Sequence, residues 1–254
     1  MIAAGIDCGA KNTKTVIMKD GKIMGKGIVF TGFDQESAIN GSLDAALKDA
    51  GITKDAVEKW GGTGSGKKSI QGATEVNDIK AMAKGGSYFF PKTRTVADVG
   101  AEEGRAVKVD ENGNAVDFAI NEKCAAGAGA FVEAMARALE VTIEEMGSLC
   151  LQSDKTIPIN AQCVIFAESE VVGLIHAKTS KPDISRAIHD AIASRVVSMI
   201  RRIGVNEDIV LMGGVGYNPG FKDAMARELG VTVYVPERPE FSMAVGAAVV
   251  AAGA

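Results

Sequence analysis

The chain has 254 residues, of which 46% are hydrophobic and 24% are charged, and its formal net charge is −4. This composition is typical of a soluble globular protein with one large domain or two lobes, and it offers no basic field that would attract nucleic acid. No apolar run approaches the roughly 20 residues of a membrane span, and the N-terminus lacks the order of a signal peptide. We therefore expect a cytoplasmic protein with neither nucleic acid nor membrane as a partner.

The N-terminal part predicts three strands and a helix. The apolar segment IAAGID ends in Asp7-Cys8-Gly9, and KTVIMKD and KIMGKGIVF form a hairpin around Asp20-Gly21. Apolar residues at helical spacing predict a helix over 35–50, which Gly51 ends.

Residues 60–69, WGGTGSGKKS, approach the pattern of a nucleotide-binding P-loop. That pattern needs Ser or Thr after Gly66-Lys67, because the hydroxyl coordinates Mg²⁺, and here the residue is Lys68. The preceding DAVEKW is also too polar for the buried parallel strand that a P-loop follows. We reject the P-loop and look for the nucleotide elsewhere.

The opening pattern of the chain recurs. RTVADVG is a second apolar strand that ends in Asp-Val-Gly, and RAVKVDENGNAVDFAI predicts a hairpin that turns at Asn112-Gly113. Asp98 follows Asp7 at an offset of 91 residues (98 − 7), and Gly100 follows Gly9 at the same offset (100 − 9). This internal repeat predicts two similarly built lobes.

The remaining elements mix helices and strands. CAAGAG opens an alanine-rich helix to about Glu140, and a helical region over 163–203 is interrupted near 180–182. DIVLMGG and VTVYVP predict strands, FKDAMARELG a helix, and MAVGAAVVAAGA a closing helix. We expect an α/β protein with a first lobe over 1–91 and a second over 92–239, a division that lets the C-terminal helix of about 240–254 return to the first lobe.

The strand-ending turns are the residues suited to chemistry. Asp7 and Asp98 offer carboxylates for Mg²⁺, and Lys14 offers positive charge for phosphates. The glycines of the turns allow a phosphate or an adenosine to approach the backbone; they are Gly9, Gly100, Gly213 and Gly214. A single Asp-x-Gly usually does no more than close a strand, so it is the repetition of this turn that favours a phosphate-binding role.

These motifs resemble those of a known superfamily. GIDCGAKNTK, ADVGAEEG and LMGGVGYNPG resemble the two phosphate motifs and the adenosine motif of the actin, Hsp70 and sugar-kinase superfamily. NEKCAAGAGAFVEAMARAL and AQCVIFAESEVVGLIHAK resemble the BadF/BadG/BcrA/BcrD-type ATPases, which activate 2-hydroxyacyl-CoA dehydratases or serve benzoyl-CoA reductases. The resemblance covers essentially the whole chain. It implies a two-lobed ATPase with ATP or ADP and Mg²⁺ in a cleft between the lobes, and it adds Asn12 and Thr13 to the phosphate-binding residues.

The resemblance also implies an iron–sulfur cluster. In the family, each of two subunits donates two cysteines to one shared [4Fe–4S] cluster, and Cys124 and Cys163 match those cysteines. Their spacing alone does not identify a cluster, and without the resemblance both read as structural thiols. The implied partners are a paralogous ATPase subunit or a second copy, iron–sulfur subunits that reduce the substrate, and ferredoxin as the electron donor.

One departure from the family pattern affects the expected function. Activators read D-x-G-G-Q-D in the second phosphate motif, whereas this chain reads DVGAEEG, with Ala101, Glu102 and Glu103 at the last three positions of that pattern. Glu103 still reaches a metal or water, but Glu102 carries charge where an amide would orient water, so hydrolysis is expected to be slower. This variant resembles one of the two unlike ATPase subunits of benzoyl-CoA reductases.

The expected function is therefore an ATPase that drives low-potential electron transfer to an aromatic acyl-CoA ring, with Asp7, Asp98, Glu102 and Glu103 as catalytic residues. Activation of a 2-hydroxyacyl-CoA dehydratase is the alternative within the family. A small sugar kinase is the rival from another class, and for that chemistry Asp78 is the candidate base.

Overall fold

A computed structural model describes residues 1–121, 128–160 and 164–253. The chain divides into two compact units, which are described separately. Unit 1 contains Met1–Val96, Val109–Val116 and Pro236–Ala254, and unit 2 contains Ala97–Lys108 and Asp117–Val235. Among the described residues, no helix is long and apolar enough to cross a membrane.

Unit 1 is built on a five-stranded sheet of order β3-β2-β1-β4-β5. Its strands are β1 (Ile2–Cys8), β2 (Asn12–Lys19), β3 (Lys22–Phe30), β4 (Lys59–Thr63) and β5 (Thr74–Glu75). The first three form the expected antiparallel hairpins, and β4 runs parallel to β1. Gly21, at the first hairpin turn, has a φ of +77°, a conformation that glycine adopts without steric cost.

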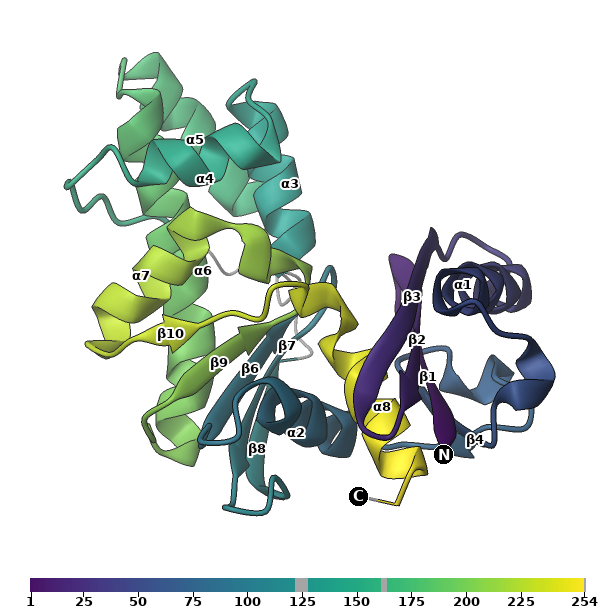
Figure 1. The fold of residues 1–254 in the computed structure, drawn as a ribbon. Helices are drawn as coiled ribbons and strands as arrows, with labels where there is room; N and C mark the ends of the chain where they lie inside the picture. The colour runs from purple at the N-terminus through teal and green to yellow at the C-terminus, as the bar shows by residue number, and fades with distance from the viewer. Residues whose placement is uncertain (122–127, 161–163, 254) are drawn as a thin grey trace. The chain divides into compact units, whose positions relative to one another are not determined.

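Helix α1 (Gln35–Ala50) covers one face of this sheet (Figure 1). It begins and ends as the sequence predicts: the Asp34 side chain accepts from the Ser37 amide, and Gly51 closes the helix with a φ of +67°. A Cβ at Gly27 would lie 2.0 Å from the Ser42 carbonyl oxygen, so glycine in β3 is what lets the helix backbone approach the strand.

Helix α8 (Ser242–Ala251) covers the opposite face, where it packs on Val16 and Met18 of β2 (Figure 1). It also packs against α2 (Asp78–Phe89), a helix that the apolar pattern did not predict. The packing of α8 on the sheet requires glycine in β1, since a Cβ at Gly5 would lie 1.9 Å from the Ala244 carbonyl oxygen. The small residues of the C-terminal segment are therefore packing residues of unit 1.

The interpretation of residues 55–60 as too polar for a buried strand needs a correction. Strand β4 begins at Lys59 and is buried at Gly61, Gly62 and Thr63. Its inner part has no apolar side chains because α8 takes their place: a Cβ at Gly61 would lie 2.3 Å from the Ala247 carbonyl oxygen. The rejection of the P-loop still fits the structure, because β4 leads into the three-residue 3₁₀ turn η2 (Lys67–Ser69) and not into an α-helix.

Unit 2 contains most of a second five-stranded sheet, of order β10-β9-β6-β7-β8. Its strands are β6 (Thr95–Val99), β7 (Gly104–Val109), β8 (Ala115–Asn121), β9 (Ile209–Met212) and β10 (Val233–Tyr234). Counted from the hairpin edge, this order is β8-β7-β6-β9-β10, which repeats β3-β2-β1-β4-β5 strand for strand. The repeat that the Asp-x-Gly offsets predict is therefore present in the sheet topology.

The helices of unit 2 pack around a single apolar core that includes Phe131, Met146, Ile188 and Phe221. They are α3 (Ala128–Ala138), α4 (Ile143–Cys150), α5 (Val164–His176), α6 (Lys181–Ile203) and α7 (Pro219–Leu229). Helix α4 was not predicted from the sequence, although its Thr142 and Glu145 form a capping box. The other four agree with the helical segments of the sequence.

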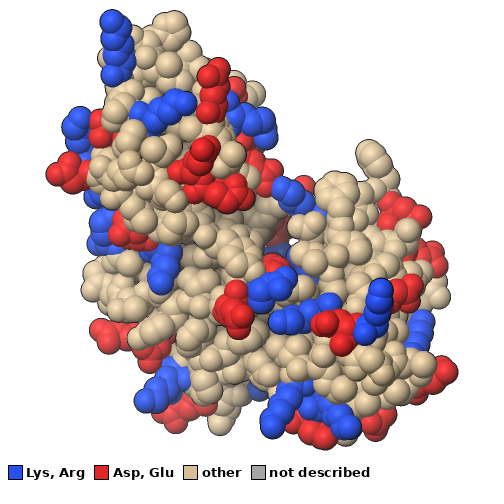
Figure 2. Space-filling view, turned by 45° about the horizontal axis from the view of Figure 1, so that its top comes forward, with Lys and Arg blue, Asp and Glu red and all other residues tan. Residues whose placement is uncertain are grey.

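The surface carries charges of both signs. Figure 2 shows acidic and basic side chains interspersed on the face that it presents, without a broad area of one sign. This agrees with the small net charge of −4.

Candidate functional site

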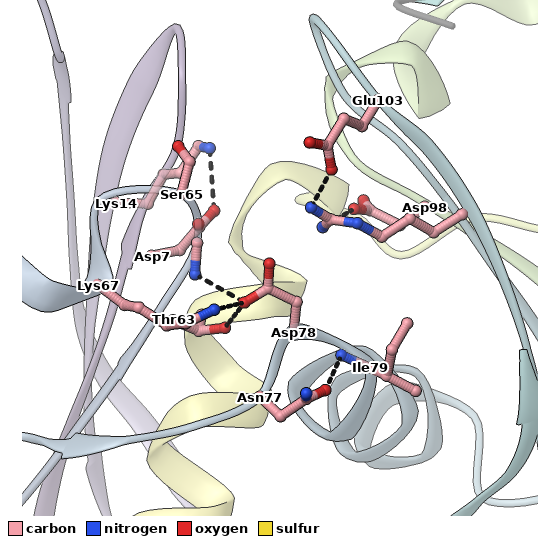
Figure 3. A network of polar contacts seen from close by, with 12 residues as sticks. Asp7, Lys14, Thr63, Ser65, Lys67, Asn77, Asp78, Ile79, Asp98 and Glu103 are labelled. Atoms are coloured by element: carbon pink, nitrogen blue, oxygen red, sulfur yellow. Dashed lines mark hydrogen bonds and ion pairs between the residues drawn. The ribbon is translucent and has the colours of Figure 1, made fainter. Parts of the chain in front are cut away.

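The first Asp-x-Gly turn places a carboxylate and an ammonium side by side at the end of β1. Asp7 pairs with Lys14 in the β1–β2 register, and the Lys14 Nζ atom lies 3.0 Å from Asp7 Oδ2. Asp7 is only 6% exposed, and the turn is closed by a hydrogen bond of 3.2 Å from the Gly9 amide to the Asn12 carbonyl oxygen. The ion pair therefore stands beside the closed turn of the β1–β2 hairpin (Figure 3).

Thr13, a predicted phosphate ligand, has its side chain inside unit 1. Its hydroxyl lies 3.0 Å from the Thr31 hydroxyl and donates to Cys8 Sγ at 3.6 Å, and the residue is fully buried. Burial raises the pKa of the Cys8 thiol, which keeps it protonated and unreactive. Only the backbone of Thr13 is therefore in a position to serve a ligand in this conformation.

A second turn, residues 63–67, lies against the end of β1. The Gly66 amide donates to the Cys8 carbonyl oxygen at 2.9 Å. Gly64 has a φ of +88°, and a Cβ there would lie 2.5 Å from Asp7 Oδ1. Asp78, the candidate kinase base, accepts from this turn through its Oδ1 atom: from Lys67 Nζ at 3.0 Å, Thr63 Oγ1 at 3.1 Å and the Gly64 amide at 3.2 Å (Figure 3).

The Asp-x-Gly turn of unit 2 repeats the geometry of the first. The Gly100 amide donates to the Glu103 carbonyl oxygen at 3.0 Å, as the Gly9 amide donates three residues ahead in unit 1. Arg105, which the sequence motifs did not indicate, lies 3.7 Å from Asp98 Oδ2 and also pairs with the Glu103 carboxylate (Figure 3). The sequence signal for Arg105 is its position two residues after Glu103 at the start of a strand. Residues two apart in a strand lie on the same face, so the two side chains can pair.

The glycine pair after β9 lies against the same turn. Gly213 has a φ of +83°, and a Cβ there would lie 2.4 Å from the Val99 carbonyl oxygen and 2.8 Å from Asp98 Oδ1. Around Gly214 an added Cβ would meet no atom within 4 Å. Gly213 is thus needed for packing on the Asp98 turn, whereas Gly214 leaves room for a ligand.

Helix α3 begins on this turn. The amides of Gly129 and Ala130 donate to the carbonyl oxygens of Gly100 and Ala101, each at 3.1 Å. A Cβ at Gly129 would lie 2.9 Å from the Gly100 oxygen, so the contact requires glycine. The Asp-x-Gly turn of unit 2 is therefore hydrogen-bonded directly to the first turn of the helix that follows Cys124 in the sequence.

The two predicted cluster ligands, Cys124 and Cys163, lie outside the described residues. Within the described part of the chain, no group of three or more His, Cys, Asp or Glu residues is arranged to hold a metal ion. Cys8 and Cys150 are buried free thiols, and burial raises the pKa of Cys150 to about 11.

In each unit the residues of the Asp-x-Gly turn fit the binding of Mg²⁺ and phosphate. Mg²⁺ in such sites takes one or two carboxylates, substrate phosphates and water, and Asp7 and Asp98 each stand at the tip of a buried strand. Lys14 and Arg105 place positive charge beside these carboxylates, where phosphate oxygens would gain from it.

Residues 4–251 match the BadF/BadG/BcrA/BcrD ATPase family. The chain belongs to this family. The activator of lactoyl-CoA dehydratase from Anaerotignum propionicum is 37% identical over 99% of this chain and 97% of its own length. One of the subunits of the benzoyl-CoA reductase of Thauera aromatica is 28% identical over 97% of this chain and 92% of its own length.

Two solved structures of family members superpose on nearly the whole chain. Component A of (R)-2-hydroxyglutaryl-CoA dehydratase from Acidaminococcus fermentans is 34% identical, with a TM-score of 0.93 over 99% of this chain and 97% of that one. The activator of 2-hydroxyisocaproyl-CoA dehydratase from Clostridium difficile, solved with bound ADPNP, is 34% identical, with a TM-score of 0.90 over 99% and 94%.

These comparisons confirm the predicted fold class and family. A sugar kinase, the glucokinase of Streptomyces griseus, shares the fold at 15% identity and a TM-score of 0.64, and that likeness extends to the fold alone. An ATP-binding ATPase role follows from the family. The comparisons favour the alternative, a dehydratase activator, over the expected benzoyl-CoA reductase, because relatives named as dehydratase activators are 33–37% identical and the reductase relative is 28% identical.

Proposed function

We propose that this chain is an ATP-dependent activator that delivers electrons to a 2-hydroxyacyl-CoA dehydratase. The observation that carries the proposal is the similarity over nearly the whole chain to proteins named as such activators. The reductase interpretation rested on the local departure DVGAEEG, and whole-length similarity outweighs three residues. Reduction of an aromatic acyl-CoA remains the second candidate, supported by that departure and by the family relation to the benzoyl-CoA reductase of Thauera aromatica.

Under this proposal the two Asp-x-Gly turns serve ATP. Asp7 in unit 1 and Asp98 in unit 2 would each offer a carboxylate to Mg²⁺, and Lys14 would neutralise phosphate charge. The turns at Gly9 and Gly100 would let the phosphates approach the backbone, and Asn12, Gly213 and Gly214 would complete the nucleotide-binding set. Glu103 would orient the attacking water, with Arg105 fixing Glu103 in place, and Glu102 would stand where other family members carry an amide.

The electron-transfer half of the proposal involves residues outside the described segments. Cys124 and Cys163 would each supply a thiolate, so two chains together provide the four ligands of one [4Fe–4S] cluster. When bound, such a cluster stores and passes single electrons. The contact of Gly100 and Ala101 with the start of α3 supports a link between ATP and that region, since α3 follows Cys124 closely in the chain.

A partner chain is part of the proposal. Helix α5, which follows Cys163, exposes four large apolar side chains: Ile165, Phe166, Val172 and Ile175. The Ile165 side chain is 71% exposed and that of Phe166 is 63% exposed. A group of exposed apolar side chains of this kind marks a surface that binds another protein. A second copy of this chain or a paralogous ATPase would cover this face and complete the cysteine set, with ferredoxin as the donor and the dehydratase as the acceptor.

The deciding experiment compares Cys124→Ser with a matched control, Cys150→Ala, on protein purified without oxygen. We expect about two irons per chain in the unmodified protein and in the control, and iron loss in Cys124→Ser. ATP-dependent reduction is then assayed with a 2-hydroxyacyl-CoA dehydratase and, separately, with a benzoyl-CoA reductase.

Full iron content in Cys124→Ser would contradict the ligand assignment. Electron delivery to the reductase but not to the dehydratase would replace the proposed function by the second candidate. Phosphorylation of a sugar, with no iron in any variant, would reject both.

A further inference from the structure

The turn over residues 63–67 touches the proposed Mg²⁺ ligand of unit 1, and none of the phosphate motifs includes it. Gly64 packs so closely on Asp7 that an added Cβ would lie 2.5 Å from Oδ1, and it would lie 2.6 Å from the Cys8 carbonyl oxygen. The Gly66 amide also donates to that oxygen at 2.9 Å. The position of this turn therefore limits where the Asp7 carboxylate can go.

The Asp78 side chain fastens the turn to the start of α2. Asp78 Oδ1 accepts hydrogen bonds from the Gly64 amide, the Thr63 hydroxyl and the Lys67 ammonium, all between 3.0 and 3.2 Å. Asp78 is the first residue of α2, where the helix dipole favours a carboxylate. Its side chain is 18% exposed and that of Lys67 is 28% exposed, so solvent screens the pair only in part.

A glycine-rich turn has little stiffness of its own. Gly64 and Gly66 lack side chains, and glycine loses more conformational freedom on ordering than any other residue. Three donors converging on a single carboxylate oxygen restore that order, because each restrains a different part of the turn: its first residue, its backbone and its last residue. Asp78 thus fastens the whole length of this turn to the start of α2.

We infer that Asp78 is a positioning residue for Asp7: it holds the 63–67 turn against the end of β1 and thereby keeps the Asp7 carboxylate oriented for Mg²⁺. This inference rests on the proposed function, because it assumes that Asp7 serves Mg²⁺–ATP. It also gives Asp78 a role without a sugar substrate, since its Oδ1 accepts from three donors that favour the charged carboxylate.

The test compares Asp78→Ala and Asp78→Asn with Asp44→Asn, which removes an exposed carboxylate of α1. Hydrogen–deuterium exchange of the peptide over 61–67 reports the turn directly, and Mg²⁺ titration of ATP hydrolysis reports its consequence. For Asp78→Ala we expect faster exchange in this peptide and a half-saturating Mg²⁺ concentration raised roughly ten- to hundredfold, as for other residues that orient metal ligands. Asp78→Asn keeps an acceptor oxygen, so its shift should be smaller, and the control should match the unmodified protein.

Two milder variants guard against loss of folding, which the fluorescence of Trp60, the single tryptophan, monitors. Thr63→Val and Lys67→Met each remove one donor, and each should raise the half-saturating Mg²⁺ concentration in the same direction as Asp78→Ala. A half-saturating concentration within twofold of the unmodified protein in every folded variant would overturn the inference.

The result also separates this inference from the proposed function. If the unmodified protein hydrolyses ATP and Asp7→Asn does not, the proposed ATP site stands, and the Asp78 variants alone decide the inference. If hydrolysis by the unmodified protein needs no Mg²⁺, or Asp7→Asn hydrolyses normally, the proposed site fails, and the inference falls with it.

Discussion

At the residue scale, Glu102 and Glu103 depart from the family pattern, and their surroundings in unit 2 differ. The Glu103 carboxylate pairs with Arg105, which also lies near Asp98, so the negative charge of this position is compensated within unit 2. Glu102 is exposed on the same turn. Glu102 is therefore the residue whose charge would oppose the approach of a phosphate.

Replacing Glu102 by Gln should increase ATP hydrolysis. The substitution removes the opposing charge and supplies the amide that family members carry, and we expect the rate to rise about tenfold, equivalent to ~1.4 kcal/mol in the barrier. Steady-state phosphate release measures it. Glu111→Gln, in the exposed hairpin turn after β7, is the control and should leave the rate unchanged. A slower Glu102→Gln enzyme would mean that Glu102 acts as a base.

His189 makes the stability of unit 2 depend on pH. It is fully buried in α6, its Nδ1 lies 2.7 Å from the Ser185 carbonyl oxygen, and burial lowers its pKa below the usual 6.5. The unfolded chain then binds a proton more readily than the folded one, so stability is highest above about pH 6.5 and falls as the pH drops below it.

Thermal unfolding between about pH 8 and pH 5 should therefore show a midpoint temperature that falls as the pH is lowered, and His189→Gln should flatten this dependence. The pH range ends at about 5 so that Asp183 does not affect the measurement. Hydrogen bonds from Lys155 and Ser153 lower the pKa of Asp183 to about 2, so its contribution to stability is lost only in stronger acid. His176→Gln, on the exposed end of α5, should keep the dependence of the unmodified protein. An equally steep curve for His189→Gln would assign the effect to other groups.

At the element scale, glycines determine how α8 is packed. A Cβ at Gly246 would lie 1.8 Å from the Ala81 carbonyl oxygen in α2, and one at Gly85 would lie 2.1 Å from the Ser242 carbonyl oxygen. The two helices cross with their backbones in contact, which is why neither position accepts a side chain. The matched case is Gly41 in α1, where a Cβ would meet only Val29 Cγ1 at an ordinary 3.6 Å.

We expect Gly246→Ala to destabilise the protein by about 1–3 kcal/mol or more, since the clash is with backbone that cannot rotate away. Gly41→Ala should instead stabilise it by roughly 0.5–1 kcal/mol through lower backbone entropy in the unfolded state. Urea denaturation of both variants measures the two free energies. Equal effects of the two substitutions would show that helix crossing does not depend on Gly246.

At the scale of the whole molecule, the repeated sheet gives each unit its own Asp-x-Gly turn at the corresponding strand end. The two units differ in the segments that connect the strands of these sheets. Unit 1 joins β3 to β4 through α1, whereas unit 2 inserts α3 to α6 between β8 and β9. The first described helix of this insertion, α3, is hydrogen-bonded to the turn after Asp98 through the amides of Gly129 and Ala130.

This arrangement predicts that Gly129→Ala weakens the coupling between ATP and electron delivery. A Cβ there would lie 2.9 Å from the Gly100 carbonyl oxygen and 3.1 Å from Ala101 Cα, which forces the helix away from the turn. We expect ATP-dependent electron delivery to fall more than ATP hydrolysis, measured as electrons transferred per ATP, with Gly41→Ala as the control. A constant ratio in both variants would exclude this contact as the link.

The sequence by itself determined the order of most elements, the repeat and the strand-ending turns, because these depend on local patterns: apolar alternation, helical spacing and glycine turns. It also identified the family through its motifs. Strand β4 and the partners of Asp78 required the tertiary structure. The backbone that packs on Gly61 of β4 belongs to Ala247 of α8, 186 residues away in the chain (247 − 61), and the three donors around Asp78 are brought together by packing, which no local pattern contains.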